Sequence, residues 1–107
     1  MLPKKNRLSK KTIEKIFEGG KFINSPDLTL KFLVVRGKEK QTSFIVPKNI
    51  ARLAVRRNSL RRKSDIILRK YFNEFPAGFL GVFIFKKYQD DILILEDEIK
   101  NILNKIN

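Results

Sequence analysis

The sequence predicts an α+β protein with a single domain, in which helices pack against one small sheet. Helical spacing of apolar residues in three segments and clusters of strand-forming residues in three others carry this prediction. The length agrees with it, because 107 residues suit one domain with one modest core, and domains commonly run to about 100–150 residues. We expect the element order α-β-β-α-β-α over residues 1–107, with a further short strand near residues 21–24.

The N-terminal segment combines a basic arm with a short helix. Residues 1–8, MLPKKNRL, form the expected arm. Ser9 is a suitable N-cap for a helix over residues 10–18, and the pair of glycines at 19–20 ends it. The apolar face of this helix consists of Ile13, Ile16 and Phe17.

Two strands are expected next. Residues 28–35, LTLKFLVV, begin with alternating apolar and polar side chains, which predicts a half-buried strand with Lys31 on its polar face. Residues 36–41 predict a turn, and residues 42–46, TSFIV, predict a second strand that pairs back on the first. Pro47 suits the end of an edge strand.

A long helix follows these strands. It begins within residues 50–54, with Asn49 in position to cap it, and ends near Phe72, before the stop signal at residues 76–78. At about 100° per residue, its inward stripe consists of Leu53, Leu60, Ile67 and Tyr71.

The last third of the chain predicts a buried strand and a final helix. The run FLGVFIFKK, residues 79–87, consists largely of strand formers, and Gly81 within it indicates close packing. The final helix covers residues 90–106, and its apolar face consists of Ile92, Leu95, Ile99, Ile102, Leu103 and Ile106.

The composition narrows the classes of function. The net charge is +13, and residues 1–63 hold 18 basic and 4 acidic side chains, against 6 and 7 in residues 64–107. This asymmetry indicates a polyanionic partner, either nucleic acid or an anionic membrane surface. The chain has no cysteine and no histidine, which excludes disulfides, thiolate metal sites and the usual general base. The absence of cysteine suits a reducing cytoplasm, and the longest apolar run, residues 79–85, is too short to span a membrane, so we expect a cytoplasmic protein without a membrane span.

The most basic segment is RLAVRRNSLRRKSD, residues 52–65. It carries no acid before Asp65, so like charges stand at i,i+4 and destabilise the helix that holds them. With Leu60 pointing inward, the helix also has an outward row, flanked by Arg57 and Arg61 and consisting of Asn58, Arg62, Asp65 and Arg69.

This outward row predicts a phosphate-binding surface. An ordinary solvated helix face mixes glutamate with lysine, and a membrane-surface helix or calmodulin target needs a broad apolar face on a free segment. This helix fits neither description, because every charged side chain in it before Asp65 is basic and strands bracket it. We therefore expect no membrane partner. Arginine forks suit the oxygens of a phosphate backbone.

Three other side chains and two acidic clusters are weaker signals. Phe17 and Phe22 are either core residues or platforms on which the bases of a single strand stack. Lys31 either lines a basic groove or faces water. The clusters QDD at residues 89–91 and EDE at residues 96–98 fit the start of a helix, where the macrodipole favours negative charge, better than they fit a metal site. We therefore predict no metal site in the protein.

These segments resemble the protein subunit of bacterial ribonuclease P, the ribonucleoprotein that removes the 5′ leader from precursor tRNA. The opening LPKKNRLSKKTIEKIFEGGK resembles the family's usual start, in which a basic NRL leads into a helix that closes with a Phe and then Gly. The run FIVPKNIARLAVRRNSLRR resembles its signature, a strand followed by Lys and then by a basic motif. The order of elements agrees too, so the resemblance covers nearly the whole chain.

The resemblance implies two sets of site residues. For the catalytic RNA, the resemblance points to Lys48, Arg57, Asn58, Arg61 and Arg62, and we expect the neighbouring Arg52 and Arg56 to extend this RNA-binding set. The chain departs from the family's motif at two places: Ser59 stands where the family usually has an arginine, and Asn49 or Ile50 replaces the second basic residue after the strand. For the leader, which the family holds in the groove between the first helix and the sheet, the resemblance points to Phe17. From their residue types and positions we add Phe22 and Lys31 to this leader-binding set.

The resemblance also implies a fold and a division of labour. The fold is an α/β sandwich with a left-handed strand-helix-strand crossover, which is the uncommon hand. The catalytic RNA carries the chemistry with bound Mg²⁺, so the protein contributes no catalytic side chain. The implied partners are ribonuclease P RNA and precursor tRNA, and the protein alone is expected to be a monomer.

Two other functions stay open. A small basic ribosomal or general RNA-binding protein would bind many structured RNAs with similar affinity and have no role in cleavage. A protein-only nuclease would need clustered acids to hold metal ions, and the acids here fall mostly on or near the last expected helix.

Overall fold

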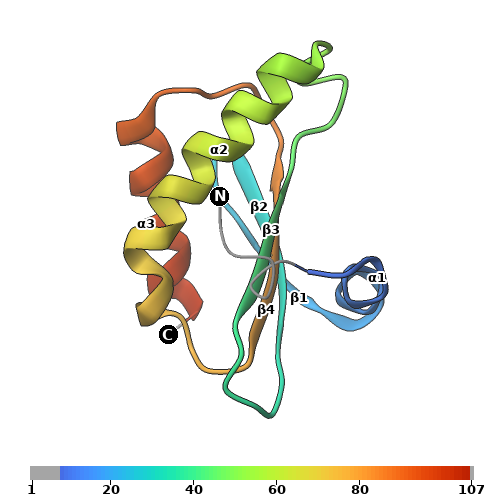
Figure 1. Cartoon of the computed structure of the whole chain (residues 1–107). Coiled ribbons are helices and arrows are strands. Elements are labelled where there is room, and N and C mark those ends of the chain that lie inside the picture. The colour runs from blue at the N-terminus through green and yellow to red at the C-terminus, as the bar shows by residue number, and fades with distance from the viewer. Residues whose placement is uncertain (1–7, 107) are drawn as a thin grey trace.

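A computed structural model describes residues 8–106, in which a four-stranded sheet lies between α2 and α3 on one face and α1 on the other (Figure 1). The elements in chain order are α1 (Lys10–Gly19), β1 (Lys21–Asn24), β2 (Leu28–Val34), β3 (Gln41–Ile45), α2 (Ala54–Tyr71), the 3-10 turn η2 (Phe72–Glu74), β4 (Phe79–Phe85) and α3 (Ile92–Ile106). The predicted α+β class and element order are confirmed, including the short first strand. The predicted arm lies outside the described residues, except for Leu8.

The sheet has the strand order β1-β2-β4-β3. β2 pairs antiparallel with β1 and with β4, whereas β3 pairs parallel with β4. The prediction that residues 42–46 pair back on residues 28–35 is therefore wrong. β4 takes the place between them because its side chains are covered on both faces, while β3 alternates between buried and half-buried positions. A strand that is apolar on both faces belongs in the centre of a sheet.

Two glycines fit β4 into this position. Gly78 precedes the strand with φ of +78°, and a Cβ there would lie 1.9 Å from the carbonyl oxygen of Val35. A Cβ on Gly81 would lie 2.5 Å from the ring of Phe79. The predicted close packing at Gly81 is confirmed, and any larger residue there would displace an aromatic ring of the core.

The core lies between the sheet and the helices α2 and α3. Phe44 and Phe83 stack with ring centroids 4.8 Å apart, and Phe75 packs on Phe79 at the same distance. The largest side chains that are fully buried around these rings are Leu28, Leu30, Leu60, Ile67, Leu68, Phe85, Leu95, Ile99 and Ile102. Of the predicted apolar face of α3, only Ile92 is exposed (48%), because it is the first residue of the helix.

The inward stripe of α2 is confirmed at Leu60 and Ile67, which are each 1% exposed. It is wrong at Leu53, whose side chain is 63% exposed. The helix begins at Ala54, so Leu53 has an extended backbone and does not follow the helical period. Asn49 does not cap the helix either, because the N-cap position is Leu53, which offers no side-chain hydrogen bond.

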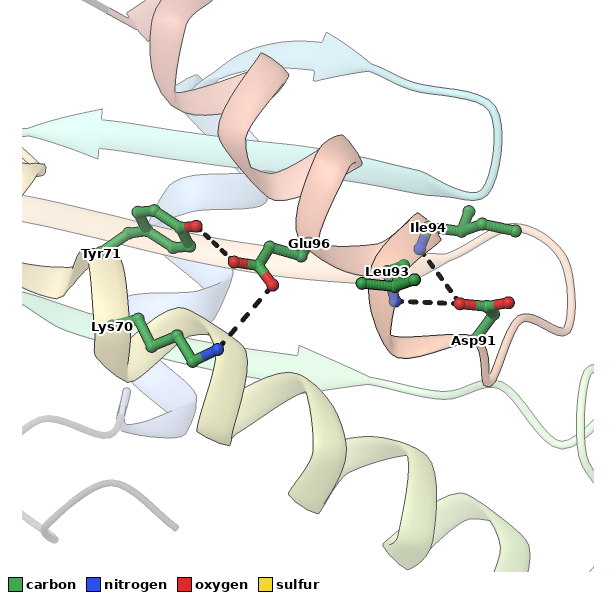
Figure 2. Close-up of polar contacts among 6 residues, drawn as sticks. All are labelled: Lys70, Tyr71, Asp91, Leu93, Ile94 and Glu96. Carbon is green, nitrogen blue, oxygen red and sulfur yellow. Dashed lines mark hydrogen bonds and ion pairs between the residues drawn. The ribbon is translucent and has the colours of Figure 1, made fainter.

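Two polar side chains fix the starts of the other helices. Ser9 caps α1 as predicted, with its Oγ accepting a hydrogen bond from the Thr12 amide at 3.3 Å. The Asp91 carboxylate accepts hydrogen bonds from the amides of Leu93 at 2.9 Å and Ile94 at 3.4 Å at the start of α3 (Figure 2). This part of the acidic cluster thus has a structural role. Among residues 8–106 no three acids lie close enough together to hold a metal ion.

The C-terminal end of α2 is attached to α3 through Glu96 (Figure 2). The hydroxyl of Tyr71 donates a hydrogen bond to Glu96 Oε2, and Lys70 Nζ lies 3.8 Å from Glu96 Oε1. The hydrogen bond to this carboxylate raises the pKa of Tyr71 to about 12. Tyr71 is therefore a neutral donor throughout the physiological range.

No helix within residues 8–106 has the length and apolar character needed to cross a bilayer.

Glu98 is the buried acid of α3, with 5% of its surface exposed. Its Oε1 accepts a hydrogen bond from the Ser25 hydroxyl at 2.5 Å and from the Asp27 amide at 2.8 Å. These bonds attach the loop between β1 and β2 to α3. Burial, together with the nearby Asp27 side chain, raises the pKa of Glu98 above its ordinary value of 4.5.

The raised pKa predicts a pH dependence of stability. The folded state holds a proton on Glu98 more tightly than the unfolded state, so stability falls as pH rises from the ordinary value of 4.5 through the raised pKa. Glu98→Gln should remove this part of the fall, because a glutamine oxygen accepts the same two hydrogen bonds without a buried charge. Urea unfolding of both proteins between pH 4 and 8 measures the difference. Asp97→Asn, on the exposed side of the same helix, is the charge-matched control, and an equal change in both variants would contradict the prediction.

Candidate nucleic-acid interface

The N-terminal end of α2 extends past the end of the sheet (Figure 1). The exposed basic side chains on this end and on the connection that precedes it are Lys48, Arg52, Arg56, Arg61 and Arg62, here called the basic cluster. Within residues 8–106, no carboxylate pairs with any of the five. Positive charge at a helix N-terminus opposes the macrodipole, so the cluster works against the stability of α2 and attracts anions.

Asn58 lies beside the basic cluster and is joined to its member Arg61. Asn58 Oδ1 accepts a hydrogen bond from Arg61 Nη2, three residues along the exposed surface of α2. This bond orders the Arg61 side chain and leaves its other donors available. Asn58, which was predicted in the outward row, thus lies among the cations and accepts a hydrogen bond from one of them.

Arg57 is the one predicted arginine of the motif whose guanidinium is engaged by the backbone. It is half-buried, and its Nη1 donates hydrogen bonds to the carbonyl oxygens of Ala51 at 3.0 Å and Arg52 at 2.7 Å. Periodicity places Arg57 beside the outward row but does not reveal these bonds, because they depend on the path of the chain before α2.

The outward row is exposed at Asn58, Arg62 and Arg69. Its fourth member, Asp65, was predicted to face outward and is instead only 9% exposed. Asp65 takes part in an interaction within the structure. The period of a single helix does not show what packs beside it, which is why the prediction fails at this residue.

Two exposed apolar side chains lie next to the basic cluster: Leu53, which was predicted to point inward, and Val55, which no sequence pattern singled out. Leu53 is 63% exposed and Val55 is 75% exposed, and both lie between Arg52 and Arg56 along the chain. The start of the helix one residue after Leu53 is the signal that could have found them. They give this end of α2 an apolar surface between its charges.

The second predicted set of site residues comes together on the face of the sheet that carries α1. Lys31 Nζ lies 5.0 Å from the centroid of the Phe17 ring, which is a cation–π contact. Phe22 on β1 is the cross-strand partner of Lys31 on β2, so their side chains point to the same face. Phe17 is 43% exposed and Phe22 is 64% exposed, which excludes the interpretation of either ring as a core residue.

α1 is held on this face by Ile16, which is fully buried, and it packs against β2 and β4. Val82 on β4 points to the same face and is fully buried too. The helix covers only part of the sheet, because Leu33 and Ile84 on this face are half-buried. An aromatic and apolar surface with one lysine therefore remains accessible beside α1.

The fold and these two surfaces define a small basic α+β protein of the nucleic-acid-binding class. The family model for Ribonuclease P matches residues 2–107. The chain belongs to the Ribonuclease P family, and its role is that of the ribonuclease P protein subunit. This confirms the resemblance inferred from the opening segment and the basic motif, and no finding supports a ribosomal or general RNA-binding protein.

Solved structures agree with the family. The chain is similar to the RNase P protein from Thermotoga maritima, with 24% identity and a TM-score of 0.84 over 94% of this chain and 97% of that one. It is also similar to the RNase P protein of Staphylococcus aureus, with 12% identity and a TM-score of 0.82 over 94% of each chain. At these identities the likeness establishes the fold, whose α+β class and element order are the predicted ones. No curated protein matches the sequence.

The geometry of α2 separates binding from folding. The double variant Arg61→Ala/Arg62→Ala should weaken binding to ribonuclease P RNA and lower the slope of log affinity against log salt by up to about 1.8 on duplex RNA, at about 0.9 per phosphate contact. Its stability should stay close to that of the parent, because both side chains are exposed. Leu60→Ala should instead lower the free energy of unfolding by about 2–5 kcal/mol. Filter binding over a salt series and urea unfolding measure the two effects, and equal unfolding in both variants would contradict the assignment of faces.

Proposed function

We propose that the basic cluster binds the catalytic RNA of ribonuclease P. The observation that carries this proposal is the group of five exposed cations without a carboxylate partner in residues 8–106. An RNA backbone supplies the missing negative charge, and each phosphate that is neutralised releases counterions. The exposed Leu53 and Val55 contact sugar or base surfaces between the phosphates. Asn58 takes part by holding Arg61.

We further propose that cleavage of the precursor tRNA takes place on the RNA and not on the protein. Mg²⁺ bound by the RNA would activate water and stabilise the leaving oxygen. The side chains of the protein bind and orient RNA, and none acts as a general base. In this proposal the protein enters the complex as a monomer, and the complex works in the cytoplasm.

The face beside α1 is proposed to hold the single-stranded leader. The exposed rings of Phe17 and Phe22 offer surfaces for base stacking, and Lys31 supplies positive charge between them. Stacking on an aromatic side chain does not depend on base identity. This surface therefore suits leaders of different sequence, as a protein that serves many tRNA precursors requires.

A reconstitution assay tests the role of the protein in cleavage. The full-length chain, added to a bacterial ribonuclease P RNA at low Mg²⁺, should increase the rate of leader removal from precursor tRNA, because the basic cluster replaces part of the charge screening that Mg²⁺ supplies. The rate is measured for the RNA alone, for the protein alone and for both together. The protein alone should cleave nothing.

Each alternative has its own outcome in this assay. Cleavage by the protein alone would show a protein-only nuclease. Equal binding to unrelated structured RNAs, without any increase in cleavage, would show a general RNA-binding protein. Either outcome would contradict the proposed function.

Leader binding can be tested separately at Phe22. Phe22→Ala in the reconstituted complex should weaken binding of precursor tRNA by about 1–3 kcal/mol, the usual contribution of one stacked base. Binding of mature tRNA, which has no leader, should not change. Val34→Ala is the matched control, since Val34 is 53% exposed and, by strand alternation, lies on the opposite face. An equal loss for precursor and mature tRNA would contradict the assignment.

A further inference from the structure

The connection between β3 and α2 carries two members of the basic cluster, Lys48 and Arg52. It is anchored at Val46 and Ala51, which are 8% and 5% exposed. Between them the Pro47 carbonyl accepts hydrogen bonds from the amides of Ile50 at 3.0 Å and Ala51 at 3.2 Å. This turn orders the first part of the connection.

The second part of the connection is ordered by Arg57. The N-cap position of α2 has no side-chain hydrogen bond, so no cap residue fixes the angle at which the chain enters the helix. Arg57 Nη1 instead reaches back from the first turn and donates to the carbonyl oxygens of Ala51 and Arg52. A single guanidinium thus joins the helix to the two residues at the end of the connection.

The position of Arg57 is unfavourable for a cation that has no such partner. It stands at the positive end of the helix macrodipole, and Arg61 follows it at i+4. Two carbonyl oxygens within 3.0 Å supply the compensating negative charge. The guanidinium is therefore stabilised inside the protein before any RNA is bound.

We propose that Arg57 is a positioning residue, which holds Arg52 and Lys48 in one surface with the cations of α2. This inference rests on the proposed function, because it assigns how one part of the RNA-binding surface is built. Arg57 contributes to RNA binding chiefly by holding the backbone of Arg52 in place, and less by contacting an RNA phosphate itself. Without it, the connection would sample several conformations, and RNA binding would have to order it.

A double-mutant cycle tests the proposal on the full-length chain with ribonuclease P RNA. Arg57→Met removes the donors and keeps most of the apolar stem, and it should weaken RNA binding roughly tenfold. Combined with Arg52→Ala, it should weaken binding little further, because both changes remove the same contact. In the combination with Arg62→Ala, the fold-losses in RNA affinity of the two single variants should multiply to within about twofold, because the free-energy effects of independent sites add.

Hydrogen exchange of the free protein gives a second measurement. Loss of a residue that only contacts RNA would not change exchange when no RNA is present. Arg57→Met should speed exchange of the Ala51 amide, whereas Arg62→Ala should leave it unchanged. Additive effects of Arg57→Met and Arg52→Ala, or unchanged exchange at Ala51, would overturn the positioning role. If Arg61→Ala/Arg62→Ala also binds RNA like the parent, the proposed function itself fails. If that variant binds weakly while the cycle is additive, only the role of Arg57 fails.

Discussion

The fold depends on β4 being buried on both faces at the centre of the sheet. Its apolar run has no polar side to turn toward water, so other strands must flank it and helices must cover it. β2 takes one side antiparallel and β3 takes the other side parallel. Parallel neighbours cannot be joined by a tight turn, so the chain between β3 and β4 has to cross over the sheet. That crossover is α2, and its length and direction carry the basic cluster past the end of the sheet.

The two signs of charge have different tasks in this molecule. Acids serve the fold: Asp91 caps α3, Glu96 joins α3 to α2, and Glu98 holds the loop after β1. The basic cluster has no such intramolecular partner within residues 8–106. The acids therefore help to hold the scaffold together, and the exposed cations of the basic cluster are left for a polyanion. The charge asymmetry seen along the sequence is a division between these tasks.

Much of the fold could be predicted from the sequence, because periodicity and end signals are local. Ser9, the inward positions Leu60 and Ile67, and the short first strand all follow from neighbours a few residues away. Strand order does not, since the hairpin predicted between residues 28–35 and 42–46 ignored the competition from β4 for the same edge. The wrong assignments of Leu53 and Asp65 have a similar cause. The exposure of Leu53 depends on where α2 begins, and the burial of Asp65 depends on contacts that the helical period of α2 does not show.

The candidate site shows the same limit. Residue type and spacing were enough to find the basic cluster and to bring Phe17, Phe22 and Lys31 into consideration together. They could not show that Arg57 binds carbonyl oxygens or that Asn58 binds Arg61, because such contacts depend on the path of the backbone. The family's motif marks Ser59 as the position that lacks its usual arginine. The structure places Ser59 half-buried on α2. Arg56, Arg61 and Arg62 supply positive charge close to it in the sequence.

The attachment of α2 at both ends has a consequence for the thermodynamics of assembly. Tyr71 and Lys70 hold its last turn to α3 through Glu96, and Arg57 holds its first turn to the connection that precedes it. A charged surface whose backbone is already ordered loses little conformational entropy when it docks. Most of the electrostatic free energy then remains available for affinity, and the RNA meets a template of fixed shape.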